Sequence, residues 1–273
     1  MNRFSIIIIA LSICIGFILQ CITGNINLSL LSFPVNITLF IALIGTTFVF
    51  FKEKSQHPKL QEWASAQTSL LLLGSLCVCC FFIALVPKWE VQQSWPFNLL
   101  MGLLFTNLLL AIFRYKGPYR KRFYLNHLGL FLFMSALACG SADMHRWRAV
   151  VTVGETIDKA YDQKGILHTL GYPLKLESLK VIYYENQTPQ SFDAKVSSEG
   201  MEQNILVNYP WHKSWKEDIY IVNYGRFDEN GKEYCVLEFI NQPWKHIATL
   251  GIILTAAGAF LLLWGKKTKK RTL

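Results

Sequence analysis

The hydrophobic residues of this 273-residue chain fall into six long, uninterrupted blocks with polar segments between them. A helix rises about 1.5 Å per residue, so each block can cross a hydrocarbon core of roughly 30 Å, the shortest with little tilt. Because the blocks are apolar throughout, rather than along one stripe, they indicate lipid as the surrounding solvent. The sequence therefore predicts six transmembrane helices, over residues 4–23, 35–51, 68–86, 97–113, 125–142 and 246–264.

The polar segment 143–245, between the fifth and sixth blocks, has the two-residue alternation that is typical of β-strands. The alternation is clearest in 174–184, and 228–232 contains the Asn-Gly pair of a hairpin turn. By contrast, 155–161 reads as a short helix and 149–153 as an edge strand. We expect a mostly-β domain, either a small β-sandwich or an open barrel. Its other predicted strands are 201–208, 219–224 and 233–240.

Charge is scarce and unevenly placed. Only 16% of the residues are charged, against 52% hydrophobic, and the net charge is +9. The cations are concentrated in 52–67, 114–124 and 265–273, whereas 24–34 has no charged residue and 87–96 has one Lys and one Glu. Cytoplasmic loops of membrane proteins carry an excess of Lys and Arg, so both termini are predicted cytoplasmic and 143–245 is predicted outside. No aromatic and basic surface accompanies the charge, which argues against nucleic-acid binding.

The seven cysteines suggest a metal site at first, but their placement favours packing. Six lie within or beside the apolar blocks, where thiols behave as small hydrophobic groups. Cys77, Cys79 and Cys80 are close in sequence, yet a helix spreads their thiols over different faces, and no second Cys or His pair is nearby. We therefore expect no metal site here. Cys235 is alone in 143–245, so that segment can form no internal disulfide.

Three histidines near the predicted membrane boundaries are candidate ligands. His127 stands at the inner end of the fifth block, directly after a basic segment, where an ionisable residue is costly without a partner. Neutral imidazole is a good axial ligand for haem iron, although on residue type alone a hydrogen-bonded interfacial histidine is the simpler interpretation. His145 and His246 flank the outer surface and could share a ligand. Ordinary interfacial polarity is the simpler interpretation for them too.

The remaining polar residues form no catalytic motif. The sequence has no phosphate-binding glycine loop, nucleophile elbow, zinc-protease motif or pair of catalytic carboxylates. His57, His168 and His212 lie in predicted loops and are expected to be solvated, and Glu217 and Asp218 are expected to face solvent. We therefore expect no enzymatic activity from this chain by itself.

Four stretches, in order along the chain, resemble the ResB family of cytochrome c biogenesis proteins, also called CcsB, of the pathway known as System II. They are SWPFNLL at 94–100, NHLGL at 126–130, the pair ILVNYP at 205–210 and IYIVNYG at 219–225, and PW at 243–244 before the last span. That span contains Gly251 and Gly258. The resemblance covers residues 60–264 and has the family order of three spans, a large outer domain and one final span.

The resemblance implies a subunit that handles haem in a bacterial cytoplasmic membrane. Family members pair with a tryptophan-rich membrane protein, ResC or CcsA, and the two are thought to export haem and present it to apocytochrome c for thioether attachment. A thioredoxin-like protein is a further candidate partner. A histidine within a span of the ResB subunit is implicated as a haem ligand, and His127 matches that position. Haem would then be a transient cofactor. External haem ligands are assigned to the other subunit, so the resemblance does not strengthen the case for His145 or His246.

The chain departs from the family pattern in two respects. Residues 1–59 add two spans, and the outer domain is shorter than in many members. We therefore divide the chain into the added spans 1–59, ResB-like spans in 60–142, the outer domain 143–245, and the last span with its basic tail, 246–273.

The tryptophan-rich haem signature is absent from the sequence, because 211–215 has two Trp but lacks the Gly and Asp of that signature. We expect at most a non-catalytic subunit of a haem-attachment complex. A rival interpretation is a membrane-anchored structural or sensory module without a cofactor, whose outer domain binds a protein or an envelope component.

Overall fold

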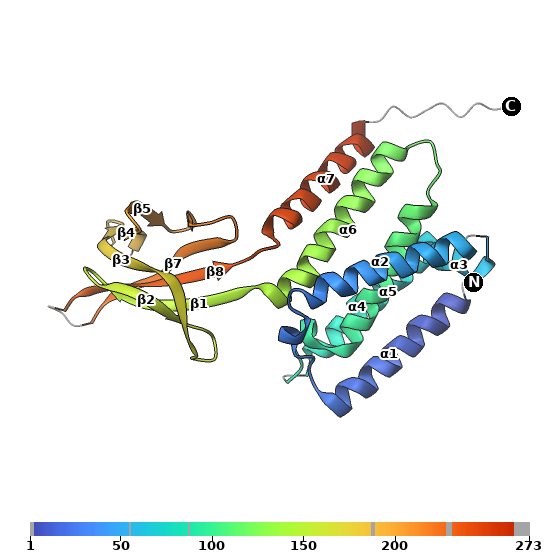
Figure 1. Cartoon of the computed structure of the whole chain (residues 1–273), viewed down its shortest axis with the longest axis horizontal. Coiled ribbons are helices and arrows are strands. Elements are labelled where there is room, and N and C mark those ends of the chain that lie inside the picture. Colours follow the sequence, from blue (N-terminus) through green and yellow to red (C-terminus); the bar gives the residue numbers. More distant parts are fainter. Residues whose placement is uncertain (1–2, 55, 87, 187–188, 228–230, 265–273) are drawn as a thin grey trace. The chain divides into compact units, whose positions relative to one another are not determined.

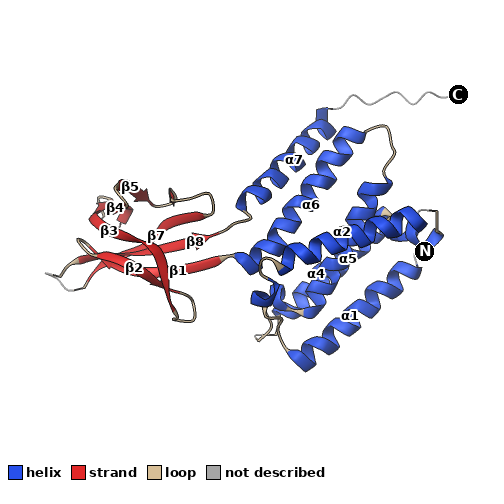
Figure 2. Ribbon diagram, viewed as in Figure 1, coloured by secondary structure: helices blue, strands red, loops and turns tan. Residues whose placement is uncertain are grey.

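The structure, a computed structural model, describes residues 3–54, 56–86, 88–186, 189–227 and 231–264. The chain divides into two compact units (Figure 1). One contains the helices before residue 142 and after residue 246, and the other is Asp143–Lys245. Figure 2 shows that the first unit is helical and that the second consists of strands. Among the described residues, six helices are long and apolar enough to cross a membrane, so the predicted membrane helices with a mostly-β segment are confirmed.

The six long helices begin and end within a few residues of the predicted blocks. They are α1 (Arg3–Thr23), α2 (Val35–Lys54), α4 (Ala66–Ala84), α5 (Trp95–Arg114), α6 (Arg120–Asp143) and α7 (Lys245–Trp264). The hydrophobic pattern did not predict the short helix α3 (Pro58–Trp63) or the 3-10 turns η1 (Leu28–Leu31) and η2 (Val91–Gln93). Pro58 and Pro96 stand in the first turns of α3 and α5, where a missing backbone N–H leaves no hydrogen bond unmade.

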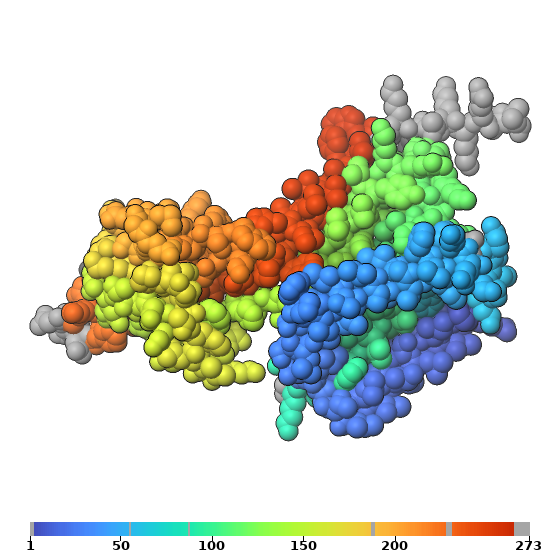
Figure 3. Space-filling model, in the orientation of Figure 1, coloured from blue at the N-terminus to red at the C-terminus, as the bar shows by residue number. Residues whose placement is uncertain are grey.

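Helix α5 is at the centre of the helical unit. In the most hydrophobic stretch of α5, 44% of the residues are buried, whereas the corresponding share is at most 28% in the other five spans. The rings of Phe40 on α2, Phe105 on α5 and Phe131 on α6 meet edge to face, with the Phe40 and Phe105 centroids 5.0 Å apart. Atoms of α1 and α2, in blue in Figure 3, cover much of the visible face of this unit.

Helix α1 is joined to α5 by close packing and by hydrogen bonds. A Cβ atom at Gly16 would lie 2.7 Å from Cα of Pro96, so only glycine allows this approach. The Gln20 side chain accepts a hydrogen bond from the backbone N–H of Trp95 at 2.9 Å, and Thr23 accepts one from the indole N–H of Trp95 at 2.7 Å. The first span is therefore an integral part of the bundle, packed against the SWPFNLL stretch that carries the family resemblance.

Helices α6 and α7 cross at glycine contacts and lie side by side in Figure 1. A Cβ at Gly129 of α6 would lie 2.6 Å from the backbone nitrogen of Thr255. One at Gly251 of α7 would lie 2.5 Å from that of Phe133, and one at Gly258 would lie 2.7 Å from that of Asn126. Small residues at a crossing let two backbones approach closely, which is a common way for helices to associate in lipid.

The second unit is a single antiparallel sheet with the strand order β5-β4-β3-β2-β1-β8-β7-β6. Its strands are β1 (His145–Thr152), β2 (Thr156–Tyr161), β3 (Leu167–Tyr183), β4 (Pro189–Ser198), β5 (Met201–Leu206), β6 (Trp211–His212), β7 (Glu217–Arg226) and β8 (Glu233–Asn241). The sheet is open rather than a closed barrel. A bridge between Leu206, the last residue of β5, and Tyr209 closes the turn that leads to β6.

Two local predictions for this sheet were wrong. Residues 149–153 are not an edge strand, because β1 lies between β2 and β8 and pairs with β8 along its whole length. Residues 155–161 are not a helix, because Thr156–Tyr161 pairs with β3 as strand β2. The Glu155 carboxylate binds the backbone N–H of Thr152 at 2.9 Å and so closes a turn rather than starting a helix. The predicted hairpin joins β7 to β8, but its residues 228–230 lie outside the described residues.

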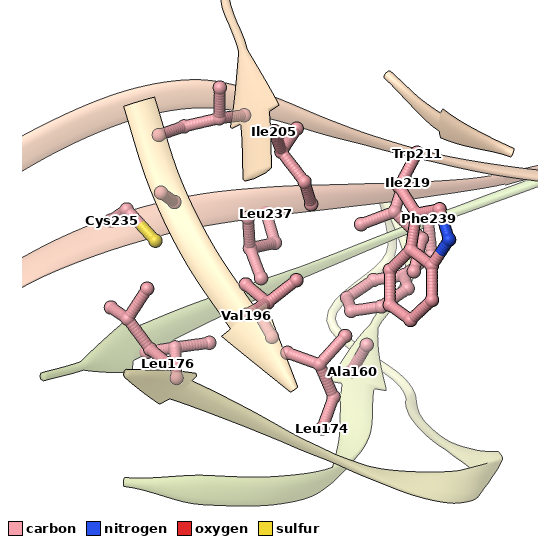
Figure 4. Close-up of a cluster of buried hydrophobic side chains, with 14 of the residues drawn as sticks. Ala160, Leu174, Leu176, Val196, Ile205, Trp211, Ile219, Cys235, Leu237 and Phe239 are labelled. Atoms are coloured by element: carbon pink, nitrogen blue, oxygen red, sulfur yellow. The ribbon is translucent and has the colours of Figure 1, made fainter. Parts of the chain in front are cut away.

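One face of the sheet carries the core of this unit (Figure 4). Every second residue of the longer strands is buried, for example Leu174 and Leu176 on β3, each fully buried. Leu237 and Phe239 on β8 have the same spacing and are also buried. Alternate side chains of a strand point to the same face of the sheet. The sheet curls around that face, so these side chains are buried without a second layer.

Candidate functional site

His127 lies in the second turn of α6 and is half-buried. Its Nδ1 atom is 2.9 Å from the carbonyl oxygen of Phe123, one turn earlier. A carbonyl oxygen can only accept a hydrogen bond, so Nδ1 carries the proton and donates it. In the neutral ring the other nitrogen, Nε2, then keeps its lone pair, which is the tautomer that a metal-ligating histidine needs.

Three rings form a stack at this end of the helical unit. The Phe123 ring lies against His127 with a centroid distance of 3.8 Å and an angle of 19° between the planes. Phe123 also stacks on Tyr115, at 3.7 Å and 5°. The Tyr124 hydroxyl donates to the backbone carbonyl of Tyr115 at 3.1 Å, which ties the segment after α5 to α6. The imidazole is therefore held both by its hydrogen bond and by a ring face.

A cavity of about 330 Å³ lies beside this stack, between the start of α4, the end of α5 and the start of α6. The small side chains of Ala64, Ala66 and Ala111 leave the space open. The other lining residues are Ser69, Arg114, Tyr115, Lys116, Phe123 and His127. Apolar walls with a few polar groups are typical of small-molecule sites, whose volumes run from about 300 to 1,000 Å³.

A buried amide fixes the wall that α3 and α4 provide. Asn107 of α5 is 2% exposed, and its NH2 group donates to the carbonyl of Trp63 at 2.5 Å. The hydroxyl of Ser69, which lines the cavity, donates to the amide oxygen of Asn107 at 2.7 Å. In lipid an unpaired polar group is costly, so Asn107 holds these segments in one arrangement.

These residues fit a haem group. Haem needs a ligating nitrogen, flat apolar surfaces and a way to accommodate its carboxylates. The cavity offers His127, the Phe123 and Tyr115 rings, three alanines and, at its rim, Arg114 and Lys116. The sequence singled out His127 but not its neighbours. Phe123 is one turn earlier on the same helix, so the helical repeat could have indicated it, whereas Arg114, Tyr115 and Lys116 precede α6.

The outer candidates His145 and His246 are both exposed. His145 opens β1 in the sheet unit, where its ring lies 6.1 Å from that of Trp147. His246 is in the first turn of α7 in the helical unit. Neither lines the cavity beside His127. Of the histidines expected to be solvated, His168 is half-buried, stacks on Trp147 at 4.8 Å and lies 3.0 Å from the Asp162 carboxylate.

Asp218 is buried, contrary to the sequence-based expectation that it faces solvent. One carboxylate oxygen lies 2.6 Å from Nδ1 of His212 and 2.7 Å from Nζ of Lys245. Burial by itself would raise the pKa of this carboxyl, but the hydrogen bonds from Lys245 and His212 outweigh it and hold the pKa below its usual value. Asp218 thereby joins β6 and β7 to Lys245, the last residue of the sheet unit.

A second buried cluster lies nearby in the sheet unit. The Lys213 side chain is 7% exposed, pairs with Glu199 at 2.8 Å and has its Nζ 4.7 Å from the centre of the Tyr172 ring. The Tyr172 hydroxyl donates to Glu217 at 2.9 Å. Burial raises the pKa of Glu217, which is half-buried rather than solvent-facing. Burial, and then the nearby Glu217, raise the pKa of Tyr172. The cluster fixes the loop before β7 to β3.

Among the described residues, no group of three or more His, Cys, Asp or Glu side chains could hold a metal ion. Cys79 is buried while Cys77 is exposed, as expected for thiols spread around a helix. Cys235 is fully buried, and burial raises its pKa to about 12.

The model of the ResB-like family matches residues 115–232. The match begins at Tyr115, so it includes the start of α6 with His127, and it runs through most of the sheet unit. It confirms the resemblance to ResB proteins. A search of curated proteins found no match.

Proposed function

From the ResB-like pattern of residues 115–232, we propose that this multi-pass membrane protein is the haem-handling subunit of a cytochrome c biogenesis complex. It takes up haem beside His127, passes it toward the outer face of the membrane and supports its attachment to apocytochrome c. A tryptophan-rich membrane protein of the ResC type is its partner. A thioredoxin-like protein keeps the cysteines of the apocytochrome reduced.

One observation carries the proposal. The imidazole of His127 lines a cavity, and its Nδ1 atom donates a hydrogen bond to the carbonyl oxygen of Phe123. This hydrogen bond leaves the lone pair of Nε2 available, so His127 would hold the iron of a bound haem together with a group from the partner. The Phe123 and Tyr115 rings and the alanine wall offer apolar surface to the macrocycle. We assign the thioether chemistry to the rest of the complex and a non-catalytic role to this chain.

The charge pattern orients the site. The basic segments 52–67 and 114–124 are cytoplasmic by the positive-inside rule. The cavity lies at the ends of helices beside these segments, and therefore near the inner surface of the bacterial cytoplasmic membrane, where haem arrives. Both termini are then cytoplasmic, and the sheet unit Asp143–Lys245 is outside, where the apocytochrome is.

The test is the haem content of the chain purified together with a ResC-type partner. We expect the wild-type complex to carry haem with a strong Soret band, and His127→Ala to lose most of the haem or to shift the band. His57→Ala is the matched control, because His57 is an exposed histidine of the helical unit that does not line the cavity.

An unchanged haem content and spectrum in an assembled His127→Ala complex would show that His127 is not a ligand. A wild-type complex that carries no haem, even after addition of ferric haem, would favour the structural or sensory module instead.

A further inference from the structure

The rim of the His127 cavity is cationic. Arg114 and Lys116 both line the cavity and both are exposed. Within the described part of the chain, no ion pair joins either cation to a carboxylate. Residues 114–124 include five basic residues and no acidic one. The rim therefore presents uncompensated positive charge to whatever enters the cavity.

Arg114 is held by a hydrogen bond, and Lys116 follows a residue of the ring stack. The Nη1 atom of Arg114 donates to the backbone carbonyl of Gln61 at 3.0 Å, which fixes the guanidinium while other N–H groups stay available. Lys116 lies between Tyr115, whose ring is in the stack, and Gly117. A Cβ at Gly117 would lie 2.6 Å from the Tyr115 hydroxyl oxygen, so a larger residue there would displace the segment that carries Lys116.

The cavity thus has two chemically different sides. The alanines and the Phe123 ring form an apolar side, and Arg114 and Lys116 form a cationic rim. A matching ligand is flat and apolar with negative charge along one edge. A guanidinium binds a carboxylate through two parallel hydrogen bonds, and an ammonium binds one as a point charge.

We propose that Arg114 and Lys116 bind the two propionate carboxylates of haem and so set its orientation, with the propionate edge at the rim and the apolar edge between the helices. This inference rests on the proposed function, because it takes haem as the ligand of the cavity. It assigns to Arg114 and Lys116 a positioning role that is separate from ligation by His127. Phospholipid phosphates have the same oxyanion chemistry, so the experiment includes them as a competing source.

The experiment compares ferric haem with haem dimethyl ester, in which both carboxylates are esterified, as ligands of the complex in nanodiscs. Dissociation constants come from Soret titrations. Two charge-assisted hydrogen bonds are lost with the ester, so we expect wild type to bind haem about tenfold or more tightly than the ester. Arg114→Gln with Lys116→Gln should weaken haem binding by a similar factor and leave ester binding within about twofold.

Two further variants separate charge from fold. Lys121→Gln removes a cation of the same segment that does not line the cavity, and it should bind both ligands as wild type does. Arg114→Lys keeps the charge but loses the planar fork, so its affinity for haem should lie between those of wild type and the double variant. If the double variant fails to assemble, Lys116→Gln alone is titrated in its place.

The outcomes distinguish this inference from the proposed function. Equal binding of haem and ester by wild type, with a spectrum that depends on His127, overturns the inference and leaves the function standing. Equal loss of both ligands in a double variant that assembles as wild type does also overturns it, since the two cations would then not act through the carboxylates. A third outcome assigns the rim to lipid. In it, phosphatidylglycerol weakens haem binding relative to phosphatidylcholine only while Arg114 and Lys116 are present, and wild type binds haem and the ester equally. Absence of any His127-dependent spectrum overturns the proposed function itself.

Discussion

The Nδ1 atom of His127 donates its proton to the carbonyl oxygen of Phe123 at 2.9 Å, and the ring of Phe123 lies against the same imidazole. The first interaction is made by the backbone and selects the tautomer, whereas the second is made by the side chain and holds the plane of the ring. The two contributions can therefore be separated by mutation.

Replacing Phe123 by Ala removes the ring and keeps the carbonyl. We expect haem to remain ligated by His127, with an unchanged Soret position, but to bind about two- to tenfold more weakly, because a stacked aromatic pair contributes about 0.5–1.5 kcal/mol. Soret titration measures this. Phe123→Tyr keeps the ring and should bind as wild type does. A shifted band in Phe123→Ala would contradict the separation of the two roles.

Gly251 lies where α6 and α7 touch, and a valine there would meet the backbone of Phe133. A Cβ atom at this position would lie 2.5 Å from the Phe133 nitrogen, so the helices must move apart. We expect Gly251→Val to destabilise the helical unit by about 1–3 kcal/mol, the usual cost of overpacking. Thermal unfolding in detergent measures the change. Gly74→Val is the control, because Gly74 has open space around it, and equal destabilisation by both variants would argue against a specific crossing.

Asp218 should make the sheet unit sensitive to acid. Its folded pKa is lowered below its usual value, so its contribution to stability is present above the unfolded pKa of about 3.9 and is lost as the pH falls through the folded pKa. Asp218→Asn should reduce stability at pH 7 by about 2 kcal/mol, through weaker bonds to Lys245 and His212, and should reduce the loss of stability below about pH 4.

Thermal unfolding of the full chain between pH 7 and pH 3, followed by tryptophan fluorescence, tests the role of Asp218. Asp158→Asn is the control, because Asp158 is an exposed acid on β2 of the same sheet. A steeper acid dependence in Asp218→Asn than in wild type would show that the sign assigned to its pKa is wrong.

Cys235 should be chemically silent. The thiol is fully buried on β8, and burial raises its pKa to about 12, so almost none is thiolate near pH 7. We expect no maleimide labelling of Cys235 in the folded protein and rapid labelling after denaturation, as measured by peptide mass spectrometry. Gln203→Cys places an exposed thiol on β5 as a positive control. Labelling of Cys235 at a comparable rate would show that its thiol is accessible in the folded protein.

Local pattern was sufficient for the spans. Each of the six long helices coincides with an apolar block, because lipid imposes its length and composition on every span separately. The contacts of α1 were not predictable in this way. Gly16 and Gln20 bind Pro96 and Trp95 across more than 70 positions of sequence, and no pattern within α1 identifies those partners.

The strands were predictable where alternation is strong and not elsewhere. Leu174 and Leu176 show the period-2 burial that indicated β3. The segment 155–161 is built from residue types that also suit a helix. It forms a strand because it pairs with β3. The same holds for the position of β1 in the sheet, which depends on β2 and β8 rather than on its own residues.

The sequence by itself determined that this is a membrane protein with a mostly-β insertion, and it singled out His127 by residue type and position. Only the tertiary structure decided what surrounds that histidine. Hydrophobic length is a property of one segment, but a cavity exists only where α4, α5 and α6 meet, and there Arg114 and Lys116 come to share it with His127. Likewise Asp218 is buried, and its carboxylate pairs with Lys245, 27 residues later. Charge and burial at such places depend on which segments fold together, and a single segment does not contain that information.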